Sequence, residues 1–94
     1  MFLHIGDSFI VNLKDIIAIL DIENTTVTKK SRMFFQRAEE KGAVVYICDD
    51  MPKSAVITYI NGEQIVYISP ISCITLRKRA NKLLNVIYKR RRLC

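Results

Sequence analysis

The sequence predicts an α+β domain with an antiparallel or mixed sheet of about six short strands, one central helix and a basic C-terminal helix. Three observations lead to this fold class. Short apolar runs rich in β-branched residues alternate with turn-forming residues along most of the 94 residues. Two other segments place apolar residues at the three-to-four spacing of a helix. The C-terminal segment also holds most of the positive charge, and one domain is expected to span residues 1–94.

Three strands are expected to open the domain. Residues 2–5 and 8–11 flank a turn at Gly6-Asp7, and both are short and apolar. Residues 16–20 form a continuous apolar run of strand length that is richer in β-branched residues than a helix needs. These three segments therefore predict the first half of the sheet.

A helix is expected near residues 29–41, after a polar connection over residues 21–27. Thr26 or Thr28 can cap its first turn, and Gly42 can end it, because glycine readily adopts the left-handed conformation that closes a helix. The residues expected on its apolar face are Met33, Phe34 and Ala38, and those expected on its polar face are Lys29, Lys30, Arg37 and Lys41.

The strongest local signal is a hairpin in the second half of the chain. Residues 43–48 form another apolar run, closed by the turn-forming residues 49–52. Residues 55–60 and 63–69 are β-rich and flank Asn61-Gly62, the preferred pair for a two-residue type I′ turn. This pattern predicts two adjacent antiparallel strands.

The last helix is expected after Pro70 and carries its apolar residues on one side. Their spacings of 3, 4, 3 and 4 are those of an amphipathic helix, whose apolar stripe is expected to pack inward. The stripe consists of Cys73, Leu76, Ala80, Leu83 and Ile87. Within the predicted domain, residues 81–94 form a basic C-terminal extension.

The sequence predicts a cytoplasmic protein with no membrane partner. It has no uncharged run of 18 residues, and its N-terminus lacks the basic and apolar regions of a signal peptide. Its three cysteines have no metal-site or redox-motif spacing. Cys48 and Cys73 are expected to be small core residues, and Cys94 an exposed end.

Catalysis is not expected, because the chain lacks a tuned acid, base or nucleophile with an orienting partner. His4 is the only histidine, and with Asp7 and Ser8 it occupies a single turn whose side chains cannot easily converge. We expect His4 to be a partly buried strand residue. The sequence has no glycine-rich nucleotide loop, so we predict no enzyme, cofactor, metal or small-molecule substrate.

The charge is concentrated near the C-terminus. Residues 1–74 contain seven bases and nine acids, whereas the remainder contains eight bases and no acid. The segment could bind nucleic acid, lie on a membrane surface, or be the solvated face of a packed helix. We favour nucleic acid, and DNA over RNA, because RNA recognition typically uses a platform of exposed aromatic side chains and none is evident. The candidates for such a platform are Tyr46, Tyr59 and Tyr67.

Four segments carry a resemblance to a known family. They are residues 1–7, 14–19, 52–58 and 67–80, which include Pro52-Lys-Ser and a Ser-Pro-x-Ser-x-x-Thr-Leu pattern followed by bases. Over residues 1 to about 80 the chain resembles the RemB branch of the RemA/RemB extracellular-matrix, or biofilm, regulators. The resemblance implies a DNA-binding regulator that activates matrix genes and assembles into ring-shaped homo-oligomers.

The resemblance also indicates which residues meet DNA. The RemA branch uses an arginine before an early strand, where this chain has Lys14, and an arginine pair before the hairpin, where this chain has only Lys53 after two acids. Arg79 matches a base in both branches. The predicted DNA-binding residues are Lys14, Lys53, Arg77, Lys78, Arg79, Lys89, Arg90, Arg91 and Arg92. The alternative is a non-catalytic structural or partner-binding module that has lost its DNA contacts.

Overall fold

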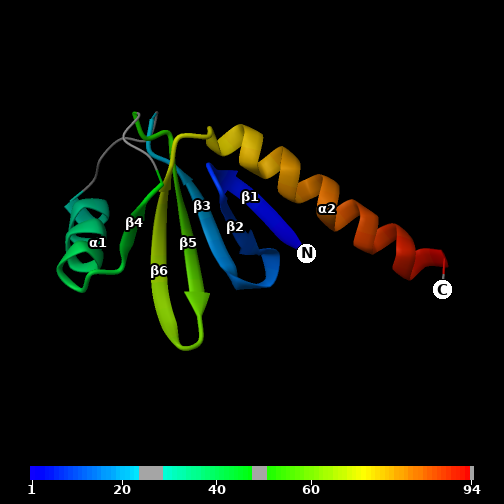
Figure 1. The fold of residues 1–94 in the computed structure, drawn as a ribbon, viewed down its shortest axis with the longest axis horizontal. Coiled ribbons are helices and arrows are strands. Elements are labelled where there is room, and N and C mark those ends of the chain that lie inside the picture. Colours follow the sequence, from blue (N-terminus) through cyan, green and yellow to red (C-terminus); the bar gives the residue numbers. More distant parts are fainter. Residues whose placement is uncertain (24–28, 48–50, 94) are drawn as a thin grey trace.

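Six strands, two helices and one 3-10 turn make up the described part of the chain (Figure 1). The computed structural model describes residues 1–23, 29–47 and 51–93, and the side chains of residues 1–23, 32–47 and 51–85. The elements are β1 (Phe2–Gly6), β2 (Phe9–Asn12), η1 (Leu13–Asp15), β3 (Ile16–Asp21), α1 (Lys29–Glu40), β4 (Val44–Tyr46), β5 (Ser54–Ile60), β6 (Glu63–Ser69) and α2 (Cys73–Leu93).

The six strands form two sheets. The larger has the order β3-β5-β6-β4, in which β4 runs parallel to β6 and the other pairs are antiparallel. The strands β1 and β2 form a separate antiparallel hairpin. The predicted α+β class, strand number and mixed pairing are confirmed. The strands do not join one sheet, because the β1–β2 hairpin packs its apolar side onto a face of the larger sheet instead of pairing with its edge.

The central strand β5 is buried on both faces. On one face Val56 packs in a core with Leu3 of β1 and Leu76 of α2. On the other face Ile57 packs in a second core with Ala38 of α1. A strand covered on both sides reads as a continuous apolar run, which is the pattern of residues 55–57. The larger sheet is thus the middle layer, between α1 and the layer formed by the hairpin and α2 (Figure 1).

Backbone geometry confirms the predicted hairpin turn between β5 and β6 and the predicted end of α1. Asn61 and Gly62 have φ of 50° and 83°, the positive values that a type I′ turn requires. Gly42, with φ of 67°, ends α1. The Ala43 N–H donates to the Ala38 carbonyl at 2.9 Å and the Gly42 N–H to the Glu39 carbonyl at 3.0 Å, which together form a Schellman motif. The predicted threonine cap lies outside the described residues.

The described apolar side chains in the first part of α2 pack onto the rest of the molecule. Cys73 and Leu76 are buried as predicted, and Ala80 and Leu83 pack partly against the same core. The helix continues without a break to Leu93 and extends past the sheets (Figure 1). The predicted positions of Cys48 and Cys94 lie outside the described residues.

One prediction about a single side chain is wrong. His4 is exposed, because it alternates along β1 with Leu3 and Ile5, whose side chains face the core. Its ring Nε2 lies 2.6 Å from the Asp7 carbonyl oxygen. Met33 lines the same cavity as Phe34 and Ala38, so these three residues share one face of α1 as predicted, although Met33 is 42% exposed.

Buried hydroxyl groups connect the layers. The Ser69 hydroxyl donates to the Ile5 carbonyl at 2.6 Å and accepts from the Ile71 N–H at 3.0 Å. The Ser54 hydroxyl donates to the Ile71 carbonyl at 2.8 Å. Among the described residues, every buried polar side-chain atom has a hydrogen-bond partner. Ser69 therefore joins the N-terminal hairpin, the larger sheet and the segment that leads into α2.

We expect the substitution Ser69→Ala to lower the free energy of unfolding by about 1–3 kcal/mol, because it leaves buried backbone groups without a partner. Urea denaturation followed by circular dichroism measures this loss. The control is Ser8→Ala, which removes an exposed hydroxyl from the β1–β2 turn and should change stability by less than about 0.5 kcal/mol. Equal stability of the two variants would contradict the proposed importance of the Ser69 bonds.

Candidate nucleic-acid interface

Lys14 and Lys53 are exposed, and local backbone bonds position both of them. Lys14 lies in η1, where its N–H donates to the Asn12 side-chain oxygen at 3.2 Å. Lys53 immediately precedes β5. Its N–H donates to the Ser69 carbonyl at 2.9 Å, and its carbonyl accepts from the Ile22 N–H at 3.2 Å. Both ammonium groups are therefore carried on ordered backbone with their side chains free to reach a ligand.

The structure does not bring Lys14 and Lys53 together within one chain. Lys14 comes just before β3, and Lys53 just before β5. These strands are antiparallel, with Asp21 at the end of β3 opposite Ser54 at the start of β5. The two lysines thus lie at opposite ends of this strand pair, separated by about 20 Å at the usual rise of a β-strand. They cannot contact the same phosphate group.

Three of the predicted bases of α2 are exposed. They are Arg77, Lys78 and Arg79, whereas the preceding residue, Leu76, is buried. Lys82, which the predicted site omits, is also exposed and comes four residues after Lys78. Residues four apart on a helix are neighbours on its surface, so this spacing was the signal that could have identified Lys82.

Arg79 differs from its neighbours because it bonds to β1. Its Nη1 donates to the His4 carbonyl at 3.2 Å and lies 3.5 Å from His4 Nδ1. A carbonyl oxygen can only accept, so His4 Nε2 donates to the Asp7 carbonyl and Nδ1 is the ring atom that faces Arg79. Arg79 therefore links α2 to the hairpin in addition to carrying a positive charge.

The remaining predicted bases are at the end of α2. Lys89, Arg90, Arg91 and Arg92 belong to its last turns, which continue the helix beyond the packed part. Their side chains lie outside those that the structure describes. From residue 64 to the end of the chain there is no acid, so α2 carries positive charge only.

The candidate aromatic residues Tyr46, Tyr59 and Tyr67 do not form one platform. Tyr67 is partly buried and packs against Phe9, with ring centroids 6.2 Å apart. Tyr59 is exposed near the end of β5, and Tyr46 is exposed on β4. The Tyr46 hydroxyl donates to Glu39 at 2.7 Å, and this bond, with burial and the Glu39 charge, raises the pKa of Tyr46 above its ordinary value of 10.0. A carboxylate beside the ring disfavours a nucleic-acid phosphate there.

The described residues offer neither a metal cluster nor a membrane-spanning helix. No group of three or more histidine, cysteine, aspartate or glutamate side chains in that part of the chain could hold a metal ion. Neither described helix combines the length and hydropathy needed to span a membrane.

These features define a small α+β protein whose distinguishing groups are exposed bases on η1, on the segment before β5 and on α2. The chain belongs to the RemA-like family, described as extracellular matrix regulatory protein A-like, whose model matches residues 2–80. It is 34% identical over 86 residues to extracellular matrix regulatory protein B of Bacillus subtilis (strain 168), which covers 92% of this chain and 98% of the relative. The resemblance inferred from the sequence is confirmed.

The bond from Arg79 to β1 predicts a difference between neighbouring arginines. We expect Arg79→Ala to lower the free energy of unfolding by about 1 kcal/mol, because it removes hydrogen bonds between α2 and the hairpin. Arg77→Ala removes the same charge from a side chain that makes no hydrogen bond with the described residues. It should lower the free energy of unfolding by less than about 0.5 kcal/mol. Thermal denaturation of both variants checks this, and equal midpoints would show that the Arg79 bonds contribute nothing.

Proposed function

We propose that the protein is a DNA-binding transcriptional regulator of extracellular-matrix, or biofilm, genes that acts in the cytoplasm as a homo-oligomer. It binds DNA without catalysis and contacts phosphates through repeated basic side chains. The observation that carries the proposal is the acid-free basic face of α2, with Arg77 and Lys78 exposed. Bases that neutralise phosphates release counterions and so give affinity for any duplex. Membership of a family of extracellular-matrix regulators supports the biological role.

The distance between Lys14 and Lys53 supports a binding mode in which weak phosphate contacts are repeated in several subunits. At about 20 Å apart, the two lysines of one chain provide separate phosphate contacts and not one strong site. A homo-oligomer repeats each contact, so its avidity rises through effective concentration without any new interaction. The ring that the resemblance implies would meet this requirement, and Lys14, Lys53 and the bases of α2 would act together.

Exposed apolar side chains support self-association. Phe2 and Ile10, on β1 and β2, are 61% and 59% exposed. Both line a shallow cavity of about 410 Å³ together with Lys14. Large exposed apolar side chains that lie close together favour burial in an interface. If a second copy of the chain binds there, Lys14 lies next to the subunit boundary. The Lys14 side chains of neighbouring subunits then have a fixed arrangement.

The alternative is a non-catalytic structural or partner-binding module. It is favoured by the segment before β5, where two acids, Asp49 and Asp50, precede the single base Lys53. A membrane-surface role is disfavoured, because Cys73 and Leu76 of the apolar stripe are buried against the sheet and unavailable to lipid. DNA binding is thus the property that separates the two hypotheses.

The salt dependence of DNA binding tests the phosphate contacts. For wild type, we expect affinity for a duplex of unrelated sequence to fall steeply with salt, with a log–log slope of about 0.9 per neutralised phosphate. Lys14→Ala should lower the slope by about 0.9 for each subunit that contacts DNA, without changing the thermal midpoint. Fluorescence anisotropy measures the binding.

The control for this experiment is Arg32→Ala, which removes one exposed positive charge from α1 and should leave the slope unchanged. If Lys14→Ala binds as wild type while Arg77→Ala/Lys78→Ala does not, only α2 contacts DNA. If wild type binds no duplex, the structural-module hypothesis is favoured.

Solution mass tests the assembly. We expect wild type to be a stable oligomer in light scattering, and Phe2→Ser/Ile10→Ser to shift the mass toward the monomer because the apolar contact is lost. Leu84→Ser, which changes another exposed apolar residue on α2, should keep the wild-type mass. A monomeric wild type contradicts the homo-oligomer, and an unchanged mass of the double variant places the interface elsewhere.

A further inference from the structure

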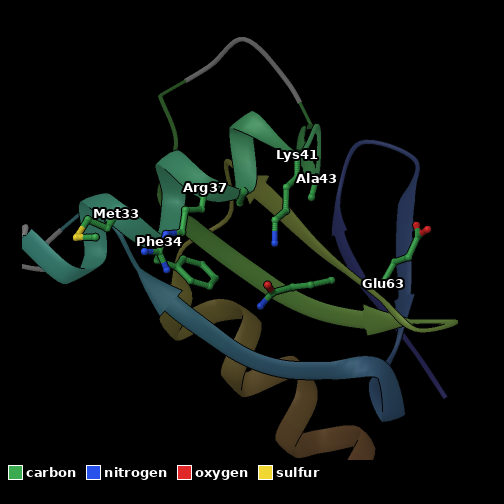
Figure 2. A pocket seen from close by; sticks show the side chains of 8 residues that line it. Met33, Phe34, Arg37, Lys41, Ala43 and Glu63 are labelled. Carbon is green, nitrogen blue, oxygen red and sulfur yellow. The ribbon is translucent and has the colours of Figure 1, made fainter.

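A cavity of about 710 Å³ lies between α1 and the start of β6 (Figure 2). Its volume is within the usual range of small-molecule sites, about 300–1,000 Å³. It lies on the α1 side of the sheet, whereas α2 and the hairpin cover the other side. The proposed DNA contacts on Arg77 and Lys78 are therefore in a different layer from this cavity.

The cavity exists because β4 is short. It pairs with β6 only from Val44 opposite Val66 to Tyr46 opposite Ile68. The first residues of β6, including Glu63 and Gln64, consequently have no strand beside them on that side within the described chain. The helix α1, tied to β4 by the tight turn at Gly42, runs above this opening.

One wall of the cavity carries two positive charges. These charges belong to Arg37 and Lys41, which are four residues apart on α1. Their side chains point toward the sheet (Figure 2). No ion pair joins either of them to another described residue. The two acids of α1 bond elsewhere, since Glu39 accepts from Tyr46 and Glu40 accepts from the Gln36 amide at 3.4 Å, and the acid that lines the cavity, Glu63, lies on its β6 side. Like charges at this helical spacing repel each other, so a bound anion would relieve the repulsion.

The remainder of the lining can hold an apolar ring and polar substituents. Phe34 is partly buried, and its contact with Phe35, at 5.4 Å between centroids and 82° between planes, restricts the ring. Ala38 is buried beside it, and this small side chain leaves space over the sheet. Glu63 and Gln64 line the β6 side, where a carboxylate and an amide can bond to hydroxyl or amino groups.

We propose that this cavity binds a small organic phosphate that carries a ring, of the nucleoside monophosphate type. The phosphate lies between Arg37 and Lys41, because a guanidinium and an ammonium match its two negative charges. The ring packs against Phe34, and its hydroxyl or amino groups reach Glu63 and Gln64. The molecule is a bound ligand and not a substrate, and the proposal is independent of DNA binding.

Adenosine monophosphate, adenosine and inorganic phosphate are suitable probes for the full-length protein at low ionic strength. We expect millimolar adenosine monophosphate to raise the thermal midpoint, and the other two compounds to raise it less, because each lacks one half of the interaction. Calorimetric titration gives the dissociation constants. An equal effect of inorganic phosphate would overturn the ring subsite, and no effect of the nucleotide would overturn the proposal.

Two double variants assign the binding to the cavity. Arg37→Gln/Lys41→Gln should weaken nucleotide binding at least about tenfold, because each lost charge-assisted bond is worth about that factor. Arg32→Gln/Lys82→Gln makes the same change in net charge at exposed positions outside the cavity and should bind the nucleotide as wild type does. If both double variants lose nucleotide affinity equally, the nucleotide is attracted by the net charge of the protein only, and the proposed site is wrong.

A cavity-filling variant and a DNA titration complete the test. Ala43→Leu keeps every charge and should also abolish the nucleotide-induced midpoint shift by occupying the cavity, while circular dichroism confirms the fold. If Ala43→Leu binds the nucleotide as tightly as wild type does, the proposed location is wrong. If Arg37→Gln/Lys41→Gln weakens duplex binding while wild type ignores the nucleotide, the pair belongs to the DNA surface and the proposal is wrong.

Discussion

The bond between the Ser69 hydroxyl and the Ile5 carbonyl joins residues 64 positions apart and determines how the layers meet. Through it, the β1–β2 hairpin is held over the larger sheet even though it pairs with no strand of that sheet. The same hydroxyl accepts from Ile71 ahead of α2, and the Ser69 carbonyl accepts from Lys53. The side chain of this one buried residue thus aligns the hairpin and the start of α2, and its backbone carbonyl positions a proposed DNA contact.

The proposed functional groups follow from this arrangement. The middle sheet is covered on both faces, and the described bases of the proposed DNA surface lie before two of its strands and on α2. Lys14 and Lys53 occupy opposite ends of the β3–β5 pair, and the bases of α2 form a third group. Dispersed charge of this kind suits an extended polyanion, whereas the paired charges of Arg37 and Lys41 beside a cavity suit a small one.

Local signals in the sequence predicted the elements well. The Asn61-Gly62 hairpin, the end of α1 at Gly42 and the burial of Leu76 depend on neighbouring residues, and all three are confirmed. The division into two sheets, the exposure of His4 and the cavity depend on packing between distant segments, which periodicity does not encode. For the candidate site, the family resemblance indicated Lys14 and Lys53, but only the strand register shows their separation.

The long α2 changes the hydrodynamic behaviour of the protein. Its 21 residues span about 30 Å, and those after Leu83 extend beyond the core. The radius of gyration, 14.2 Å, exceeds the value of about 12 Å expected for a compact chain of this length. Extents of 46 × 28 × 26 Å describe a particle with increased friction, which diffuses more slowly than a sphere of equal mass. Elution volume calibrated with spherical standards will therefore overestimate the mass of an unassembled subunit.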